Sequence, residues 1–399
     1  MGVVMIQVSK ARGRSVPVCV AISKGAHLPT RNRAVPIALA RQPSFNVQKN
    51  KLLALADKLE VSLRRKFKAA INAIKDGIEI KKLASLIERG ASVMTIMDEI
   101  GLGVPDAAFS DVRDALHSTY NQAGALTAGQ VHGTETAGKV LQVTFNGYNQ
   151  RAVNYLQTRT AKLITDITEQ SRQAVTEVLT AALENNIPPI SAAKTIRAHI
   201  GLTDRQRQAV NNYQGFLQTA DRRAFNRSIG GQAERTVTAA FRDDTMSQSK
   251  IRDLTDSYSQ RLLNSRADTI ARTETFRAVQ AANMEAWNQV TEQNDLPTKS
   301  LKRFWVATND ERTRDAHLEI VLMNEEGVGM NEPFQSPDGP IMYPGDPNAD
   351  PSESINCRCT VVYQFTDIPT EALMPQSAGR SFLPGAKDFT NQTGREEYD

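Results

Sequence analysis

The stretch YNQRAVNYLQTRTAKLITDITEQSRQAVTEVLTAALENNI, residues 148–187, decides the fold class. It runs for forty residues without a Gly or a Pro, and Pro188-Pro189 follows it. Its recurring inward positions step by three, four or seven residues, which is the spacing of one helical face: Val153, Leu156, Thr160, Leu163, Ile167, Ala174, Val178 and Ala181. At 1.5 Å per residue this predicts a helical rod of about 60 Å.

The surroundings of this rod are predicted to be helical as well. The period is close to 3.5, so both a coiled-coil-like seam against one other helix and ordinary packing inside a bundle remain open. Leucines at three- and four-residue spacing after Asn50 predict further helices up to residue 99, and a shorter helix is expected near 111–120, before a Gly-rich stretch. Thr203 and Gln206 form a capping-box pattern, and Ser265 with Asp268 is a second start signal.

Near the C-terminus the period changes from that of helices to that of strands. Alternation around Phe304–Thr308 predicts one strand, and residues 357–365 predict another. Asn309 or Asp310 is placed to cap a short helix ending near Leu322. The predicted fold is α+β and mostly α, an elongated helical body with a long helix followed by a small α+β module. We divide the chain into an extended basic arm (1–47), the helical body (48–249), the module (250–365) and a loosely ordered tail (366–399).

Charge is distributed unevenly along the 399 residues, although the net charge is only +4. Residues 1–56 hold nine Lys and Arg and no Asp or Glu, whereas residues 250–363 hold twelve basic and eighteen acidic groups. The arm also contains several prolines, and a strand is expected only over Val16–Ile22. A basic arm suggests a polyanionic or acidic partner, while a tail with non-specific positive charge is the alternative. The candidate contact residues are Lys10, Arg12, Arg14, Arg31, Arg33 and Arg41.

Several classes of protein are not indicated by the composition. Apolar runs are far shorter than the ~20 residues of a membrane-spanning helix, so no membrane anchor is expected. Three cysteines are an odd number and do not make a disulfide framework. The start lacks the apolar core of a secretory signal, so synthesis in the cytoplasm is expected. The phosphate-loop and Gly-x-Ser-x-Gly nucleophile patterns do not occur.

The most specific signal is a set of short motifs in the last third of the chain. In order, they are Ala271-Arg272-Thr273-Glu274, Trp305, Asp310-x-Arg312-Thr313-Arg314-x-x-His317, Pro344-Gly345-Asp346-Pro347 and Asn356-Cys357-Arg358-Cys359. Each motif is weak alone, but their order and spacing resemble the phage Mu F-like family of minor head proteins, the head-morphogenesis proteins of tailed phages. The resemblance covers residues 250–365, and the helical segment around Gly201-Leu202-Thr203 resembles what usually precedes this module.

The resemblance implies a structural virion protein rather than an enzyme. Such a protein would lie in the capsid interior near the portal after synthesis in the host cytoplasm. It would assist head assembly, DNA packaging or genome ejection, with the portal protein, capsid or scaffold proteins and double-stranded DNA as partners. The alternative is an enzyme delivered with the virion, a nuclease or nucleotide-dependent transferase, that uses the polar cluster from Asp310 to His317.

Two expectations concern the roles of the motif residues. Arginine forks suit carboxylates, so Arg272 and Glu274 could pair across to the segment Asp310–Arg314. His317, Cys357 and Cys359 are ligand types that zinc takes, with Asp310 or water as a fourth ligand. The alternative is that no cofactor is bound, both thiols are small buried hydrophobic groups, and His317 donates to a loop carbonyl.

Overall fold

Long helices dominate the computed structural model, which describes residues 43–136, 139–224, 232–242, 246–308 and 310–366. The helices are α1 (Phe45–Gly77), α2 (Ile80–Glu88), α3 (Val93–Glu99), α4 (Pro105–Ala108), α5 (Ser110–Val131), α6 (Gln150–Glu184), α7 (Pro189–His199), α8 (Asp204–Gln218), α10 (Gln232–Arg242), α11 (Gln248–Gln293), the 3-10 helix η1 (Thr298–Ser300), α12 (Asp315–Met323) and α13 (Pro351–Ser354). The strands are β1 (Glu135–Thr136), β2 (Lys139–Val140), β3 (Leu301–Val306), β4 (Val328–Gly329) and β5 (Thr360–Phe365). The α+β, mostly α prediction is confirmed.

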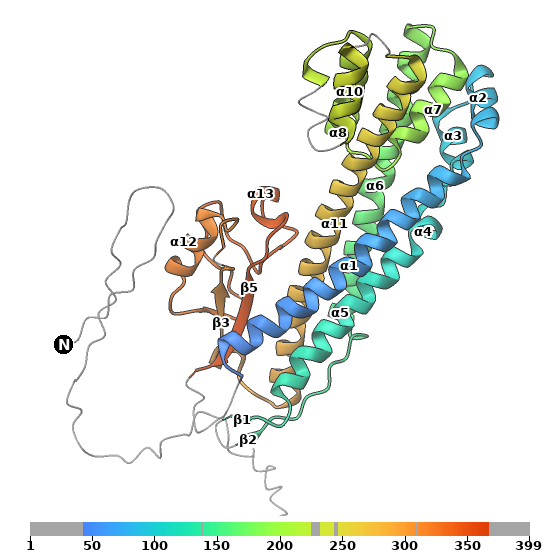
Figure 1. Cartoon of the computed structure of the whole chain (residues 1–399). Coiled ribbons are helices and arrows are strands. Elements are labelled where there is room, and N and C mark those ends of the chain that lie inside the picture. Colours follow the sequence, from blue (N-terminus) through green and yellow to red (C-terminus); the bar gives the residue numbers. More distant parts are fainter. Residues whose placement is uncertain (1–42, 137–138, 225–231, 243–245, 309, 367–399) are drawn as a thin grey trace, which may run out of the picture. The chain divides into compact units, whose positions relative to one another are not determined.

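The long helices α1, α5 and α11 pack side by side along much of their length, and α6 crosses α5 and α11 while packing chiefly against α7 and α3 (Figure 1). Their apolar stripes share one core, to which Phe67, Ile167 and Leu263 each contribute from a different helix. The predicted Gly- and Pro-free helix is confirmed as α6, which begins after the cap Asn149 and ends at Glu184. Because α6 contacts α3, α5, α7 and α11, it packs as part of a bundle and not as a two-helix seam.

Side-chain caps set where several helices begin. Ser44 accepts a hydrogen bond from the Val47 amide at the start of α1. The predicted capping box of α8 is present, with Thr203 and Gln206 each accepting from the other's backbone N–H. The second predicted start signal is wrong, because α11 begins at Gln248 and Ser265 lies inside it. No Gly or Pro interrupts residues 248–293, so the helix runs through that local signal.

The Gly-rich stretch predicted after residue 124 is partly helical instead. α5 extends to Val131 and therefore includes Gly124. A Cβ at residue 124 would overlap the ring of Phe145, which lies directly against the helix at this point. This glycine is therefore a packing position, where the missing side chain admits an aromatic ring, and not a helix terminator.

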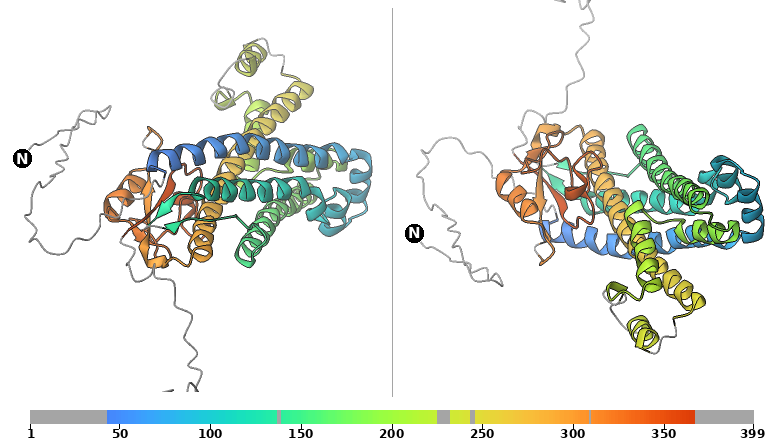
Figure 2. Two further views of the ribbon diagram at one scale, coloured as in Figure 1. Left: turned by 90° about the horizontal axis from the view of Figure 1, so that it is seen from below. Right: turned by 90° about the horizontal axis from the view of Figure 1, so that it is seen from above.

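A three-stranded antiparallel sheet in the order β4-β3-β5 forms the C-terminal part. The sheet rests on the second half of α11, where Trp287 stacks on Tyr363 with ring centroids 5.2 Å apart. On the outer edge of β5, Gln48 of α1 bonds both the N–H and the C=O of Tyr363 at 3.0 Å. The Gln48 amide thus takes the place of a neighbouring strand and covers that edge. Figure 2 shows the start of α1 beside the sheet.

Two predicted boundaries in this part were wrong. The short helix begins at Asp315 and not at residue 311, because Asp310 closes a turn with Arg312 and Thr313 instead of capping a helix. The last strand begins at Thr360, so Cys357 and Cys359 precede it.

The predicted N-terminal arm lies outside the described residues up to residue 42, and α1 already begins at Phe45. The strand expected over Val16–Ile22 and the tail beyond residue 366 also lie outside the described residues. No described helix is long and apolar enough to cross a membrane.

Candidate functional site

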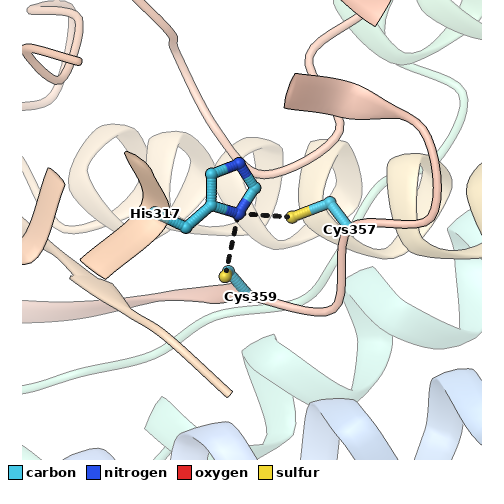
Figure 3. Close-up of side chains that lie close together, drawn as sticks. All are labelled: His317, Cys357 and Cys359. Carbon is cyan, nitrogen blue, oxygen red and sulfur yellow. Dashed lines mark hydrogen bonds between the residues drawn. The ribbon is translucent and has the colours of Figure 1, made fainter. Parts of the chain in front are cut away.

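One histidine and two cysteines of the predicted motifs meet in the C-terminal part (Figure 3). The Nδ1 atom of His317 lies 3.6 Å from the Cys357 Sγ atom and 3.4 Å from the Cys359 Sγ atom. The three side chains are 1–3 % exposed, and their ligand atoms all lie within 4.8 Å of one another. Among the described residues, this is the group whose ligand types and spacing suit a metal ion.

The loop carrying the cysteines is fixed from both sides. Asn356 adopts a left-handed φ of 57°, and its N–H donates to the Thr273 hydroxyl on α11 at 3.1 Å. The Thr308 hydroxyl, just after β3, donates to the carbonyl of Arg358 at 2.7 Å. Between these contacts both thiols turn inward, and the Arg358 side chain remains partly exposed. The two thiols thus face the same imidazole from a segment that precedes β5.

The three side chains of the cluster shift one another's pKa values. A hydrogen bond from Cys357 lowers the pKa of Cys359, and His317 lowers it further. The same contact between the thiols raises the pKa of Cys357, with burial adding to it. Burial lowers the pKa of His317, but Cys359 and Glu353 outweigh this and the net change is upward. The two thiols and the imidazole therefore influence one another, with the pKa of Cys359 lowered and the pKa values of Cys357 and His317 raised. Both thiols are free, with no disulfide between them.

The walls of this cluster come from β3 and α13. The Trp305 ring packs edge-on against the His317 ring, with centroids 5.5 Å apart. On the far side of the imidazole, the Glu353 carboxylate lies 2.8 Å from Nε2, although this contact is not aligned as a hydrogen bond. Burial raises the pKa of Glu353.

A second buried polar group surrounds Glu274 in the middle of α11. Arg159 of α6 donates to both oxygens of this carboxylate, from Nε at 2.7 Å and from Nη2. Arg277 donates to it at 2.8 Å and continues to the Gly345 carbonyl at 2.9 Å and the Ser354 hydroxyl at 3.1 Å. Glu274 and Arg277 therefore join α6 and α11 to the loop at Gly345 and to α13.

The expected pairing of Arg272 and Glu274 with the segment Asp310–Arg314 was wrong. Arg272 pairs with Glu60 of α1 at 3.2 Å, because it points to the opposite side of α11 from Glu274. Arg314 donates to the Ile355 carbonyl at 2.6 Å and so holds the loop before the cysteines. Arg312 and Asp310 lie in an exposed turn.

Several functional contacts escaped the sequence interpretation. Arg303 is fully buried in β3 and donates to the carbonyls of Gly329, Met342 and Glu332. The sequence did contain a signal for Arg303. It lies two positions before Trp305 in the same strand, so both side chains point to the buried face of the sheet. Arg159 and Glu353 had no comparable signal, because their partners are distant in sequence, whereas Arg277 follows its partner Glu274 by three residues, a helical spacing visible in the sequence. The arm residues Lys10, Arg12, Arg14, Arg31, Arg33 and Arg41 lie outside the described residues.

Comparison with known proteins gives one match. The sequence model of the family described as "Phage Mu protein F like protein" matches residues 231–362. Neither a curated protein nor a solved structure matches the chain. The matched stretch runs to β5 and includes the His317 cluster and Glu274 with Arg277, in agreement with the motifs that the sequence presents. Residues 231–362, about a third of the chain, are therefore similar to the phage Mu F-like family.

Proposed function

We propose that this chain is a structural minor head protein of a tailed phage, located inside the capsid near the portal. Its proposed role is to assist head assembly, DNA packaging or genome ejection, in contact with the portal protein, capsid or scaffold proteins and double-stranded DNA. The Mu F-like domain points to a phage head morphogenesis protein of the virion, and this match carries the proposal.

The roles of the motif residues support a structural function. Glu274 and Arg277 join helices to loops, Trp305 lines the core, and Arg314 holds a backbone carbonyl. These contacts use the polar side chains to hold the protein together rather than to face a substrate. A rigid tie between a helical bundle and a small sheet suits a component that must keep its shape in an assembly.

The alternative, a virion-delivered nuclease or transferase, needs the polar residues from Asp310 to His317 to act together. His317 is buried against two thiols, whereas Asp310 and Arg312 lie in an exposed turn, so they do not converge. Incubation of the pure protein with duplex DNA and divalent metal tests this alternative. Cleavage that is lost in His317→Ala would support the enzyme and contradict the structural proposal.

Heads assembled with and without the protein provide the direct test. We expect the protein to co-purify with the portal protein from intact heads, and heads lacking it to have a lower DNA content or infectivity. Normal DNA content and normal infectivity of the deficient heads would contradict the proposal.

The contact with DNA is tested by salt dependence. Each phosphate contact adds about 0.9 to the slope of log affinity against log salt concentration, so replacing six arm cations with Gln should flatten the slope. The arm variant changes Lys10, Arg12, Arg14, Arg31, Arg33 and Arg41. The control removes equal charge from exposed positions on the helices or at a helix end, namely Lys51, Lys58, Arg65, Lys81, Arg89 and Lys194. Equal slopes for both variants would remove the arm from the proposal.

A further inference from the structure

The His317, Cys357 and Cys359 cluster goes beyond the head-protein function, because nothing in that function requires two thiols and an imidazole to converge. His317 comes from the first turn of α12, and the cysteines come from the loop before β5 (Figure 3). Residues 324–356 separate them and contain little regular structure, namely the two-residue β4 and the four-residue α13. The cluster therefore lies where the two ends of an irregular segment meet.

The distances in the cluster fit a tetrahedral zinc ion. With Zn–S near 2.3 Å and Zn–N near 2.0–2.1 Å, a tetrahedral angle places a nitrogen and a sulfur ligand about 3.6 Å apart. The two Nδ1–Sγ distances are 3.6 Å and 3.4 Å. These two distances therefore differ from the tetrahedral value by no more than a few tenths of an ångström. Proton-mediated contacts join these atoms pairwise, whereas one ion at their centre would bond to all three.

Charge and orientation favour the same occupant. Two thiolates and a neutral imidazole balance a divalent cation, which matters in a site buried to this degree. Glu353 contacts the Nε2 side of the ring at 2.8 Å, so Nδ1 is the nitrogen left to face the sulfur atoms. A carboxylate behind a metal-binding histidine is the usual arrangement that orients the ring and increases its basicity.

We propose that His317, Cys357 and Cys359 bind a zinc ion, with water as the fourth ligand. The ion closes the segment 318–356 by joining α12 to the loop before β5. Its binding free energy then contributes to the folding of the C-terminal part, because the unfolded chain does not hold the three ligands together.

Metal analysis of the full chain tests the proposal. The protein is purified under reducing conditions without chelator, exposed to excess zinc, and freed of unbound metal before elemental analysis. We expect about one zinc ion per chain in the wild type and in Cys19→Ser, and loss of the ion in Cys357→Ser and Cys359→Ser. Cys19→Ser is the matched control, since it removes the remaining cysteine and leaves the cluster intact. Zinc well below one equivalent in the wild type, or equal loss in all three variants, would overturn the proposal.

Cobalt substitution keeps the proposal testable if the cluster variants do not fold. Cobalt added to the metal-free wild type should give a thiolate charge-transfer band and the intense visible bands of a tetrahedral site. Thermal unfolding should occur at a lower temperature after chelation, equally in the wild type and in Cys19→Ser. The absence of both the bands and the shift would refute zinc binding. In Glu353→Gln the three ligands remain, and zinc affinity should fall about 10- to 100-fold; an unchanged affinity would refute the proposed role of Glu353.

Discussion

Replacement of Glu274 by Gln should destabilise the protein far more than the same change at Glu169. Both carboxylates accept a two-pronged contact from one arginine, at 2.7 Å between Arg159 Nε and Glu274 and at 2.8 Å between Arg172 Nε and Glu169. The pairs differ in burial. The Glu274 and Arg159 side chains are 5 % and 12 % exposed, whereas those of Glu169 and Arg172 are 44 % and 51 % exposed.

The magnitude follows from what the change leaves behind. Glutamine has almost the volume of glutamate, so no cavity forms, but Arg159 and the 10 % exposed Arg277 would lose their shared counter-charge. Removing one partner of a buried ion pair costs about 3–5 kcal/mol in the free energy of unfolding. In a chain of 399 residues that corresponds to a fall in Tm of roughly 4–6 °C. Solvent screens the Glu169 pair, so no measurable change is expected there.

Denaturant titration with fluorescence detection measures the effect. Both tryptophans of the sequence, Trp287 and Trp305, lie in the C-terminal core and report on its unfolding. Glu274→Gln should shift the midpoint to lower denaturant, and Glu169→Gln should superimpose on the wild type. Equal shifts in the two variants, or none in either, would refute the argument that burial gives this pair its importance.

Two further predictions concern packing and pH. Gly124→Ala should lower the free energy of unfolding by about 1–3 kcal/mol, because the new Cβ overlaps the ring of Phe145. Gly129→Ala on the same helix meets open space and should raise it by about 0.5–1 kcal/mol. Thermal melts that rank the two variants the other way would contradict this. Burial lowers the pKa of His199 to about 4 from the ordinary 6.5. The unfolded state therefore binds the proton first, and stability is lost as the pH falls through 6.5 toward 4. Between about pH 7 and pH 5 this loss amounts to about 2 kcal/mol. The His199→Asn variant should lack that part of the pH dependence in urea titrations, and an unchanged pH dependence would show that His199 does not titrate as inferred.

The sequence predicted the long helices well because their signals are local and repeated. The absence of Gly and Pro over residues 148–187, together with a regular apolar stripe, leaves a helix as the simplest conformation. The same rule explains the error at Ser265, since a capping pattern inside an uninterrupted helix has no exposed end to satisfy. Gly124 is the opposite case, because no local signal explains it. A glycine is required there by the ring of Phe145, which packs against α5 from the segment after β2.

The candidate site was predictable in its members and not in its pairings. His317 and the two cysteines could be grouped from ligand chemistry alone, and the structure brings them together. The partners of Glu274 could not be found, because Arg159 lies 115 positions earlier and only the packing of α6 on α11 makes them neighbours. Arg272 and Glu274 are two positions apart on a helix and therefore face different helices, so a single shared partner was never available to both.

The matched stretch and the folding unit are different in extent. The Mu F-like match covers residues 231–362, yet its β5 edge is covered by Gln48, and Glu274 is neutralised by Arg159. Both partners lie outside the match, in α1 and α6. A sheet edge without Gln48 would expose unpaired backbone groups, and Glu274 would keep Arg277 alone among its two arginine partners. The helices before the matched stretch thus complete its core, and the long helix α11 aligns these contacts, because it packs against α1, α6 and the sheet.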